Sequence, residues 1–180
     1  MSTTPRVLLP PWPGFLKEIA GALSQPVSLH CGGGFVLAAL YGIPRSTADL
    51  DYIEVLPREA GDEVERLAGR DSALAKRYRL FLHGVMGIVD LPDGYETRLQ
   101  ELALDLRRLK LWALDPYDLL LSKLSRNSPK DREDAKYLIK KMNLGFAIFQ
   151  ARWETEMAPW IANKPHHDLT VQLWKEYFPR

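Results

Sequence analysis

The sequence predicts an α/β fold of the α+β kind, in which a small mixed β-sheet packed with helices is followed by a helical region. The first observation is a strand pattern, three glycines, a small-residue helix pattern and a second strand pattern within residues 27–56. The second is that strand patterns continue to about residue 113, and the third is a change to helical spacing from Asp115 onward. We therefore expect a sheet-bearing core over residues 1–114 and a C-terminal helical region packed on it over residues 115–180.

The expected elements follow from breakers and periodicity. Pro26 ends an amphipathic first helix, and Gly42 with Pro44 ends the helix that follows the glycines. In chain order we expect an irregular start over 1–11, a helix through 15–23, a strand over 27–30, a helix over 34–40, a strand over 49–56, a charged helix over 58–68, strands over 78–83 and 86–91, and a hairpin of 102–106 with 109–113. The sheet should therefore be complete by about residue 113.

The second region starts with a strong helix signal, because Asp115 can cap a helix whose first residue is Pro116. A break precedes the next helix, for which Ser128 is the expected N-cap with Asp131 at the capping-box position. Residues 145–180 are rich in aromatic side chains, which predicts a packed helical core rather than a base-stacking surface. His166 and His167 are adjacent, and adjacent residues do not share a helix face, so we expect a loop or a helix start there and assign the two histidines no chemistry.

Composition limits the classes of protein to consider. Apolar residues make up 46% of the 180-residue chain and charged residues 26%, which is typical of a soluble globular protein. The net charge of +1 argues against a strongly basic nucleic-acid-binding surface. Cys31 is the only cysteine, so no internal disulfide can form, and no apolar run reaches the roughly 18 residues of a membrane helix. We therefore expect a cytoplasmic protein without a membrane segment.

The most informative stretch runs from the glycines to two aspartates. Asp49 and Asp51 lie two apart in a predicted strand, so their side chains share one face. Two carboxylates held side by side repel each other unless a cation lies between them, and hard oxygen ligands suit Mg²⁺. The run Gly32–Gly34 has no Cβ atoms, so backbone N–H groups there could approach a phosphate closely. The pattern favours a site for a metal ion and a phosphorylated ligand.

The combination of Gly33-Gly34 and Asp49-Leu50-Asp51 resembles the signature of the nucleotidyltransferase superfamily. The segment 44–51, Pro-Arg-Ser-Thr-Ala-Asp-Leu-Asp, resembles AbiEii-type toxins and, more closely, a related family of small uncharacterised bacterial nucleotidyltransferases. The resemblance extends over residues 27–141. It implies a minimal nucleotidyltransferase fold of the polymerase-β type, with residues 1–114 as the catalytic core.

The resemblance also implies a third acid on a neighbouring strand. Asp90 fits, because it lies between Val89 and Leu91 in an apolar setting. The alternative is that Asp90 caps the turn that follows it, since Asp before Pro and Gly is ordinary turn chemistry. Asp105 is a second candidate, as it also lies in an apolar strand pattern.

A further set of charged residues lies in the helical region. Helical spacing places Lys123 on an apolar face, where a lysine needs an anionic partner. The resemblance suggests a nucleotide phosphate as that partner. The alternative is an internal aspartate, in which case Asp131 and Asp134 hold Lys123 and Arg126 in place.

The resemblance implies transfer of a nucleoside monophosphate from a nucleoside triphosphate to a hydroxyl acceptor, at an RNA or tRNA end or on a protein. Mg²⁺ or Mn²⁺ would be bound by Asp49, Asp51 and Asp90. The nucleotide would be held by Gly33, Gly34, Arg45, Thr47 and Lys123, with Arg126, Asp131 and Asp134 in support. A toxin role with a cognate antitoxin as partner is a further implication. The alternatives are a non-catalytic nucleotide- or partner-binding module with the same fold, and a metal-dependent nuclease.

Overall fold

The computed structural model describes residues 8–179, so the expectation for residues 1–7 lies outside the described part of the chain. The chain divides into two compact units. The first unit contains residues up to 86 together with 99–113, and the second contains residues 87–98 together with 114 onward. The helical region expected from residue 115 thus corresponds to most of the second unit, but residues 87–98 also belong to that unit.

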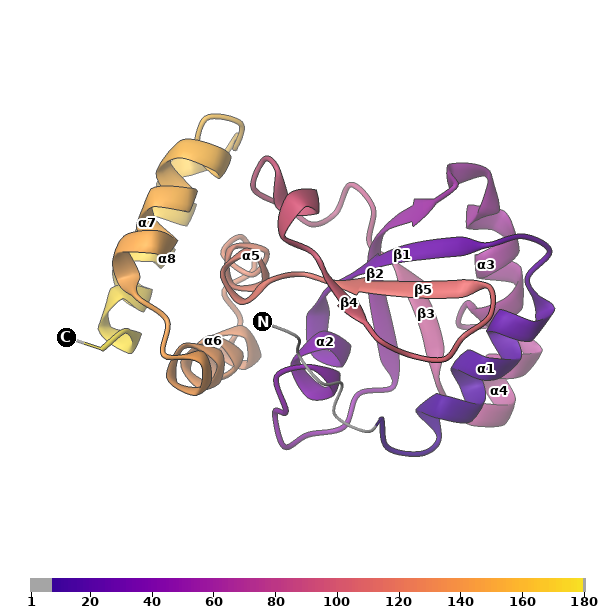
Figure 1. The fold of residues 1–180 in the computed structure, drawn as a ribbon. Helices are drawn as coiled ribbons and strands as arrows, with labels where there is room; N and C mark the ends of the chain where they lie inside the picture. The colour runs from indigo at the N-terminus through magenta and orange to yellow at the C-terminus, as the bar shows by residue number, and fades with distance from the viewer. Residues whose placement is uncertain (1–7, 180) are drawn as a thin grey trace. The chain divides into compact units, whose positions relative to one another are not determined.

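The first unit is built on a five-stranded mixed sheet with strand order β3-β2-β1-β5-β4. Its strands are β1 (Val27–Cys31), β2 (Asp49–Leu56), β3 (Phe81–Gly84), β4 (Gln100–Leu102) and β5 (Leu109–Ala113). Its helices are α1 (Trp12–Ala22), α2 (Gly33–Ala39), the 3-10 turn η1 (Arg58–Ala60), α3 (Gly61–Ala68) and α4 (Ala73–Tyr78). Helices α1, α3 and α4 lie together along one side of the sheet (Figure 1).

Strand pairing fixes which residues are neighbours in the sheet. β1 pairs antiparallel with β2 and parallel with β5, and β4 pairs antiparallel with β5. β2 also pairs in parallel with β3, in a register that sets Asp49 beside Phe81 and Asp51 beside His83. β3 is therefore an edge strand whose one neighbour is the strand that carries the two aspartates.

The core of the first unit consists of the apolar faces that the sequence pattern predicts. The fully buried side chains of α1 and the central strands include Phe15, Ile19, Leu29, Leu50 and Leu111. Burying a leucine, isoleucine or phenylalanine side chain contributes about 1.5–3 kcal/mol. The expected strand over 49–56 is confirmed residue for residue, and the expected helices over 15–23 and 34–40 are confirmed with shifted ends.

Three expectations for the first region are wrong. The strand expected over 102–106 is a strand only at Leu102, the last residue of β4, and residues 103–106 are irregular chain. Residues 78–80 are not strand, because Tyr78 ends α4, a helix that the periodicity did not reveal. Residues 86–91 are not a strand either, but form turns and irregular chain. Gly87 has a φ of +71° there and Ile88 is 74% exposed, so the apolar run is not buried as a strand would be.

The second unit is helical. It contains the 3-10 turn η2 (Tyr95–Arg98), α5 (Pro116–Leu121), α6 (Pro129–Met142), α7 (Phe146–Arg152), the π-helical turn η3 (Trp153–Met157), α8 (Lys164–Trp174) and the 3-10 turn η4 (Lys175–Tyr177). The predicted caps are confirmed, since Asp115 accepts from the Asp118 N–H and Ser128 forms a full capping box with Asp131.

The aromatic tail packs as a helical core. Helices α7 and α8 lie side by side (Figure 1), and the ring centroids of Phe149 and Trp174 are 6.5 Å apart. Phe149, Trp153 and Trp174 are buried, whereas Trp160 is 72% exposed. Among residues 8–179, no helix is long and apolar enough to cross a membrane.

Candidate functional site

Strand β2 presents the two aspartates on one face. Asp49 and Asp51 are partly exposed, while Leu50 and Tyr52 between and after them are buried on the opposite face. This alternation follows from the pleat of a strand, in which successive side chains point to opposite faces. The two carboxylates are thus held on one partly exposed face by a strand whose other face is anchored in the core.

The glycine turn contacts the second aspartate. The backbone N–H of Gly32 donates to the carbonyl of Asp51 at 3.0 Å. A Cβ atom at position 33 would lie 2.1 Å from Asp51 Oδ2, and Gly33 has a φ of +65°. Both facts require glycine at this position, because a side chain would collide with the carboxylate and strain the backbone. The turn and the carboxylate therefore form one packed unit.

The segment before β2 contacts the glycine turn at Gly34. A Cβ atom at Gly34 would lie 3.4 Å from Thr47 Oγ1 and 3.6 Å from Arg45 Nη2. The Thr47 hydroxyl in turn donates to the carboxylate of Asp49. The structure thus brings together the glycines, Arg45, Thr47 and both β2 aspartates, all within the first unit.

A histidine that the sequence analysis did not single out lies at the same place. His83 Nδ1 is 3.0 Å from Asp51 Oδ1, and the His83 side chain is 48% exposed. The sequence contains one signal that could have found His83, because the strand pattern over 78–83 ends at this residue. What it did not show is that β3 pairs with β2, which places His83 beside Asp51.

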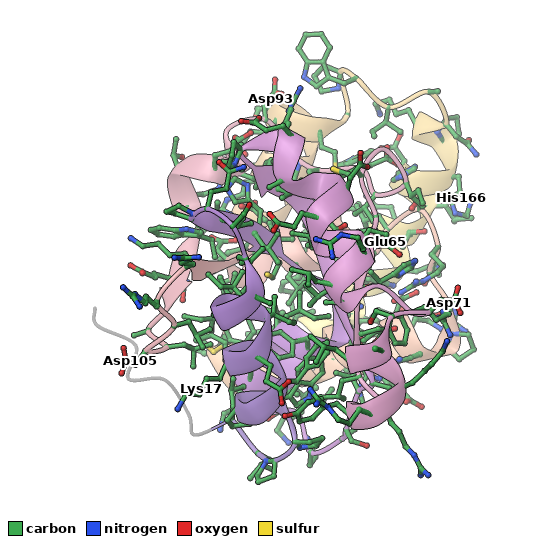
Figure 2. The ribbon with its side chains drawn as sticks, turned by 90° about the vertical axis from the view of Figure 1, so that its right-hand side faces the viewer. Lys17, Glu65, Asp71, Asp93, Asp105 and His166 are labelled. Atoms are coloured by element: carbon green, nitrogen blue, oxygen red, sulfur yellow. The ribbon has the colours of Figure 1, made fainter. Side chains whose placement is uncertain are left out.

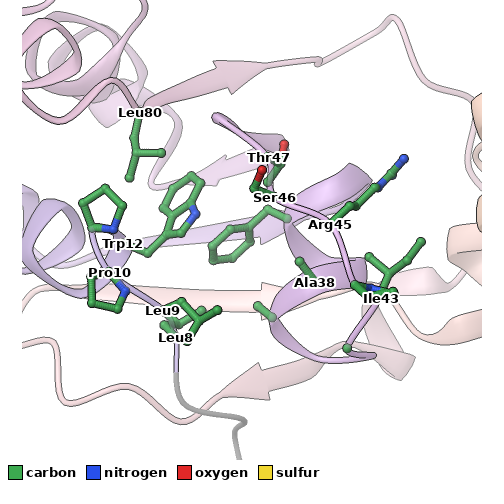
Figure 3. A pocket seen from close by; sticks show the side chains of 15 residues that line it. Leu8, Leu9, Pro10, Trp12, Ala38, Ile43, Arg45, Ser46, Thr47 and Leu80 are labelled. Atoms are coloured by element: carbon green, nitrogen blue, oxygen red, sulfur yellow. The ribbon is translucent and has the colours of Figure 1, made fainter.

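A cavity of about 580 Å³ borders this site in the first unit. Its walls are mostly apolar and include Trp12 and Phe35, whose ring centroids are 4.6 Å apart. Arg45, Ser46 and Thr47 supply the polar part of its lining, and Figure 3 shows the lining side chains from α2 and the segments on either side. The cavity therefore shares Arg45 and Thr47 with the carboxylate site.

Neither candidate for a third acid lies on a strand. Asp90 belongs to the second unit, where its Oδ2 is 3.7 Å from Nε2 of the buried His167. Asp105 lies in the β4–β5 connection, is exposed, and points outward (Figure 2). The apolar-acid-apolar setting that suggested Asp90 thus belongs to the turns and irregular chain of the second unit, and β3, the edge neighbour of β2, carries no acid.

Lys123 lies in a buried cluster of charges in the second unit. Its Nζ is 3.1 Å from Asp131 Oδ1 and 3.0 Å from Asp134 Oδ2, and the residue is 5% exposed. Arg126 donates to both oxygens of Asp131 at 2.6 and 2.7 Å. This is the internal-aspartate arrangement that the sequence left open as the alternative to a phosphate contact, so the Lys123 charge is already compensated within the unit.

The electrostatics of Asp131 follow from these contacts. Burial raises the pKa of a carboxyl group, but hydrogen bonds from Arg126 and Ser128 and the charge of Lys123 outweigh burial here. The pKa of Asp131 therefore lies well below its ordinary value. Asp131 is both the capping-box residue of α6 and the ionised centre of the cluster.

A second buried network stabilises the same unit and was not expected from the sequence. The fully buried Asp118 accepts from Arg98 at 2.9 and 3.1 Å and from Arg152 at 2.9 Å. Arg98 also bonds Glu156, and Arg152 also bonds Asp115. The network ties η2, α5 and α7 together, so these charges are structural.

Comparison with known proteins identifies a family that matches this sequence. The sequence model of the family DUF6036, described as a nucleotidyltransferase of unknown function, matches residues 23–180. The chain belongs to this family. The match includes the glycine turn, both β2 aspartates and the whole helical unit, and it confirms the expected assignment to the nucleotidyltransferase superfamily. Neither the curated proteins nor the solved structures contained a match.

The carboxylates of this DUF6036 protein suit a divalent cation. Within residues 8–179, no group of three or more His, Cys, Asp or Glu side chains is arranged to hold a metal ion. Mg²⁺ does not require such a group, because it usually binds through one or two carboxylates and completes its shell with waters and substrate phosphates. Asp49 and Asp51 share one partly exposed face and offer hard oxygen ligands of this kind.

Proposed function

We propose that this DUF6036 protein is an active nucleotidyltransferase, which transfers a nucleoside monophosphate from a nucleoside triphosphate to a hydroxyl acceptor. One observation carries the proposal: the Asp51 carboxylate packs directly against Gly33 of the glycine turn. A carboxylate pair for a metal ion and a backbone without Cβ atoms for phosphates are thus adjacent, which is what a metal–triphosphate ligand needs. The family description supports the same class of reaction.

Each part of the site has a role in this proposal. Asp49 and Asp51 would hold Mg²⁺ or Mn²⁺, which when bound neutralises triphosphate charge and activates the acceptor hydroxyl. Gly33 and Gly34 would offer backbone N–H groups to the phosphates, and Arg45, whose Nη2 would lie 3.6 Å from a Cβ atom at Gly34, would add positive charge beside them. In the reaction, the acceptor hydroxyl gives its proton to water and its oxygen forms a bond to the α-phosphorus, while the bond between the α-phosphorus and the bridging oxygen breaks and pyrophosphate leaves.

The cavity supports the proposal as a place for the nucleoside. Its volume of about 580 Å³ lies within the range of small-molecule sites. The mostly apolar lining, which includes the exposed Leu9 and Pro10, would contact a nucleobase. The polar part of the lining is the segment that also flanks Gly34, so a nucleoside in the cavity would lie next to its own phosphates.

The test is incubation of the purified protein with each α-labelled nucleoside triphosphate, Mg²⁺ or Mn²⁺, and either tRNA or a protein mixture. We expect label on one class of acceptor, and loss of labelling in Asp49→Asn and Asp51→Asn. Asp71→Asn is the matched control, because Asp71 is an exposed acid that has no role in the proposed site, and its variant should label normally (Figure 2). The two site variants should fold, because removing one of two like charges relieves repulsion.

Other results would select the alternatives. Shortened RNA without label would indicate a metal-dependent nuclease. Triphosphate binding without product in either arm would indicate a binding module. The resemblance to AbiEii-type toxins extends the proposal to growth inhibition, with a cognate antitoxin as partner. Expression of the wild-type protein should then arrest growth, whereas expression of Asp51→Asn should not.

A further inference from the structure

We propose that Phe81 and Arg70, at the β3 edge of the sheet, bind the acceptor of the proposed transfer, and that this acceptor is the unpaired end of an RNA strand. The inference rests on the proposed function and deepens it, because that function leaves the acceptor as either an RNA end or a protein hydroxyl. It starts from the strand order, in which β1 and β3 flank β2 on opposite sides. The glycine turn follows β1, so the β3 edge lies across the two carboxylates from it.

Strand β3 places an aromatic ring on the face that carries the two carboxylates. The parallel register sets Phe81 beside Asp49 and His83 beside Asp51, and side chains paired across neighbouring strands share a face. The 3.0 Å contact between His83 Nδ1 and Asp51 Oδ1 agrees with this placement. Phe81 is partly exposed and belongs to an edge strand, so a ligand can approach it from outside the sheet.

Arg70 adds a cation to this ring. Its Cζ lies 4.1 Å from the centroid of the Phe81 ring, and the residue is exposed. Arg70 has no acidic partner among residues 8–179, so its charge is not compensated within the described part of the chain. Lys76 and Arg79, which lie between Arg70 and Phe81 in the chain, also have no acidic partner among these residues. The edge beside the carboxylates therefore offers an aromatic ring and uncompensated positive charge together.

In-line transfer places the acceptor on this side of the carboxylates. The attacking oxygen and the leaving pyrophosphate lie on opposite sides of the α-phosphorus. With the triphosphate at the glycine turn, on the β1 side of β2, the acceptor hydroxyl would approach from the β3 side. Phe81 and Arg70 belong to that side, and they are the residues there that can hold an acceptor by its base and its phosphate.

The chemistry of this pair favours an RNA end over a protein hydroxyl. An unpaired nucleotide presents a flat base and a phosphate, and aromatic rings and guanidinium groups are the side chains on which unpaired bases commonly stack. The guanidinium can also donate to a phosphate. A base within a duplex is already stacked on its neighbours and cannot reach the ring. We therefore expect this surface to prefer single strands to duplexes.

The experiment measures binding of a fluorescent single-stranded oligoribonucleotide to the full-length protein by anisotropy. Triphosphate and divalent ions are left out, and the potassium chloride concentration is varied. The wild-type protein should bind the single strand more tightly than a blunt RNA duplex of the same sequence. Phe81→Leu should weaken single-strand binding about 5- to 150-fold, which is the range for loss of one stacked base. Arg70→Gln should weaken binding and lower the slope of log affinity against log salt by about 0.7, the share of one phosphate contact.

Three further variants sharpen the result. Arg70→Lys should keep the wild-type salt slope but lose affinity, because an ammonium keeps the charge and lacks the guanidinium plane. Arg77→Gln removes a cation of the same segment whose charge is paired with Glu18, and Trp160→Leu removes an exposed ring of the second unit. Both of these controls should bind the single strand normally. Arg70→Gln alters an exposed residue and should fold, so it decides the question even where Phe81→Leu lowers stability.

Two kinds of result would overturn the inference. One is wild-type RNA affinity and salt slope in Arg70→Gln, including the case in which that variant loses triphosphate binding instead. The other is a transfer assay that labels protein and no RNA. Because the binding assay contains no triphosphate, its result stands apart from transfer. RNA binding that depends on Phe81 and Arg70, without any labelled product, would sustain this RNA-binding surface while the proposed function failed.

Discussion

Oδ2 of Asp51 occupies the space that the Cβ atom of any other residue at position 33 would need, 2.1 Å away, and Gly33 has the positive φ that only glycine adopts without strain. The conformation of the turn and the orientation of the carboxylate therefore depend on each other. A substitution at Gly33 should therefore change the orientation of the Asp51 carboxylate, and a substitution at Asp51 should change how a side chain at position 33 is tolerated.

Gly33→Ala should destabilise the protein and also disturb the carboxylate. A left-handed conformation costs an alanine about 1–2 kcal/mol, and overpacking against Asp51 adds about 1–3 kcal/mol. Urea denaturation measures the sum. Under the proposed function, Mn²⁺ with a triphosphate should raise the melting temperature of the wild-type protein by linkage, and the variant should lose that rise.

Gly87→Ala separates backbone strain from overpacking, because Gly87 has a φ of +71° but no atom within 4 Å of an added Cβ. This variant should show the strain alone and lose less stability than Gly33→Ala. The double variant Gly33→Ala with Asp51→Ala should recover part of the loss, because the colliding carboxylate is gone. Strictly additive effects would show that the predicted collision is absent.

Ala38→Leu should weaken triphosphate binding by narrowing the cavity that Ala38 lines. Overpacking of about 1–3 kcal/mol in the complex corresponds to a loss of roughly 5- to 150-fold in affinity. Binding of a fluorescent nucleoside triphosphate analogue measures the change. Ala22→Leu, at an exposed position of α1, is the control and should bind normally. Equal affinity in both variants would show that the nucleoside does not enter the cavity.

Lys123→Met should destabilise the second unit, because it leaves Asp131 and Asp134 buried without their shared cation. Removing one partner of a buried ion pair costs about 3–5 kcal/mol. Methionine keeps the packing of the aliphatic stem, so the loss reports the charge. Lys140→Met, at an exposed position of α6, should stay within about 0.5 kcal/mol of the wild type in urea denaturation.

The triphosphate-dependent rise in melting temperature should persist in any folded fraction of Lys123→Met. A variant that folds with wild-type stability but has lost this rise would restore the phosphate-contact role for Lys123.

Stability should fall as the pH drops through the acid range, with Asp131 as one identifiable cause. Its pKa is depressed in the folded protein, so at acid pH the unfolded chain binds more protons at this carboxyl than the folded chain does. Its contribution is present above the ordinary aspartate pKa of about 3.9 and is lost progressively between about pH 5 and pH 2.

Asp131→Asn should therefore be less stable at pH 7 and should show a flatter decline toward pH 2 than the wild type. The free energy of unfolding measured in urea at a series of pH values gives both slopes. An identical slope in the variant would mean that other carboxyl groups account for the whole acid sensitivity.

Local patterns determined much of the first unit and the helix starts. The strand at 49–56 shows its pattern of buried and partly exposed side chains over eight residues. The N-caps Asp115 and Ser128, and the capping box of Ser128 with Asp131, act within three residues. Such signals depend on chain geometry over a few residues, so the sequence contains them in full. The neighbourhood of Gly33 and Asp51 was predicted for the same reason, since a short strand–turn–helix–strand unit connects them.

Contacts between distant segments were decided only by the tertiary structure. Hydrophobic patterning marks a strand but not its neighbour, so the place of His83 beside Asp51 follows from the pairing of β3 with β2. The apolar run over 86–91 predicted a strand because hydrophobic patterning does not distinguish an exposed run from a buried one. Lys123 was placed on a buried face by its spacing, but only the packing of α6 against α5 identified Asp131 and Asp134 as its partners. A buried charge requires a partner, and the sequence alone does not say which oppositely charged residue the folded chain will supply.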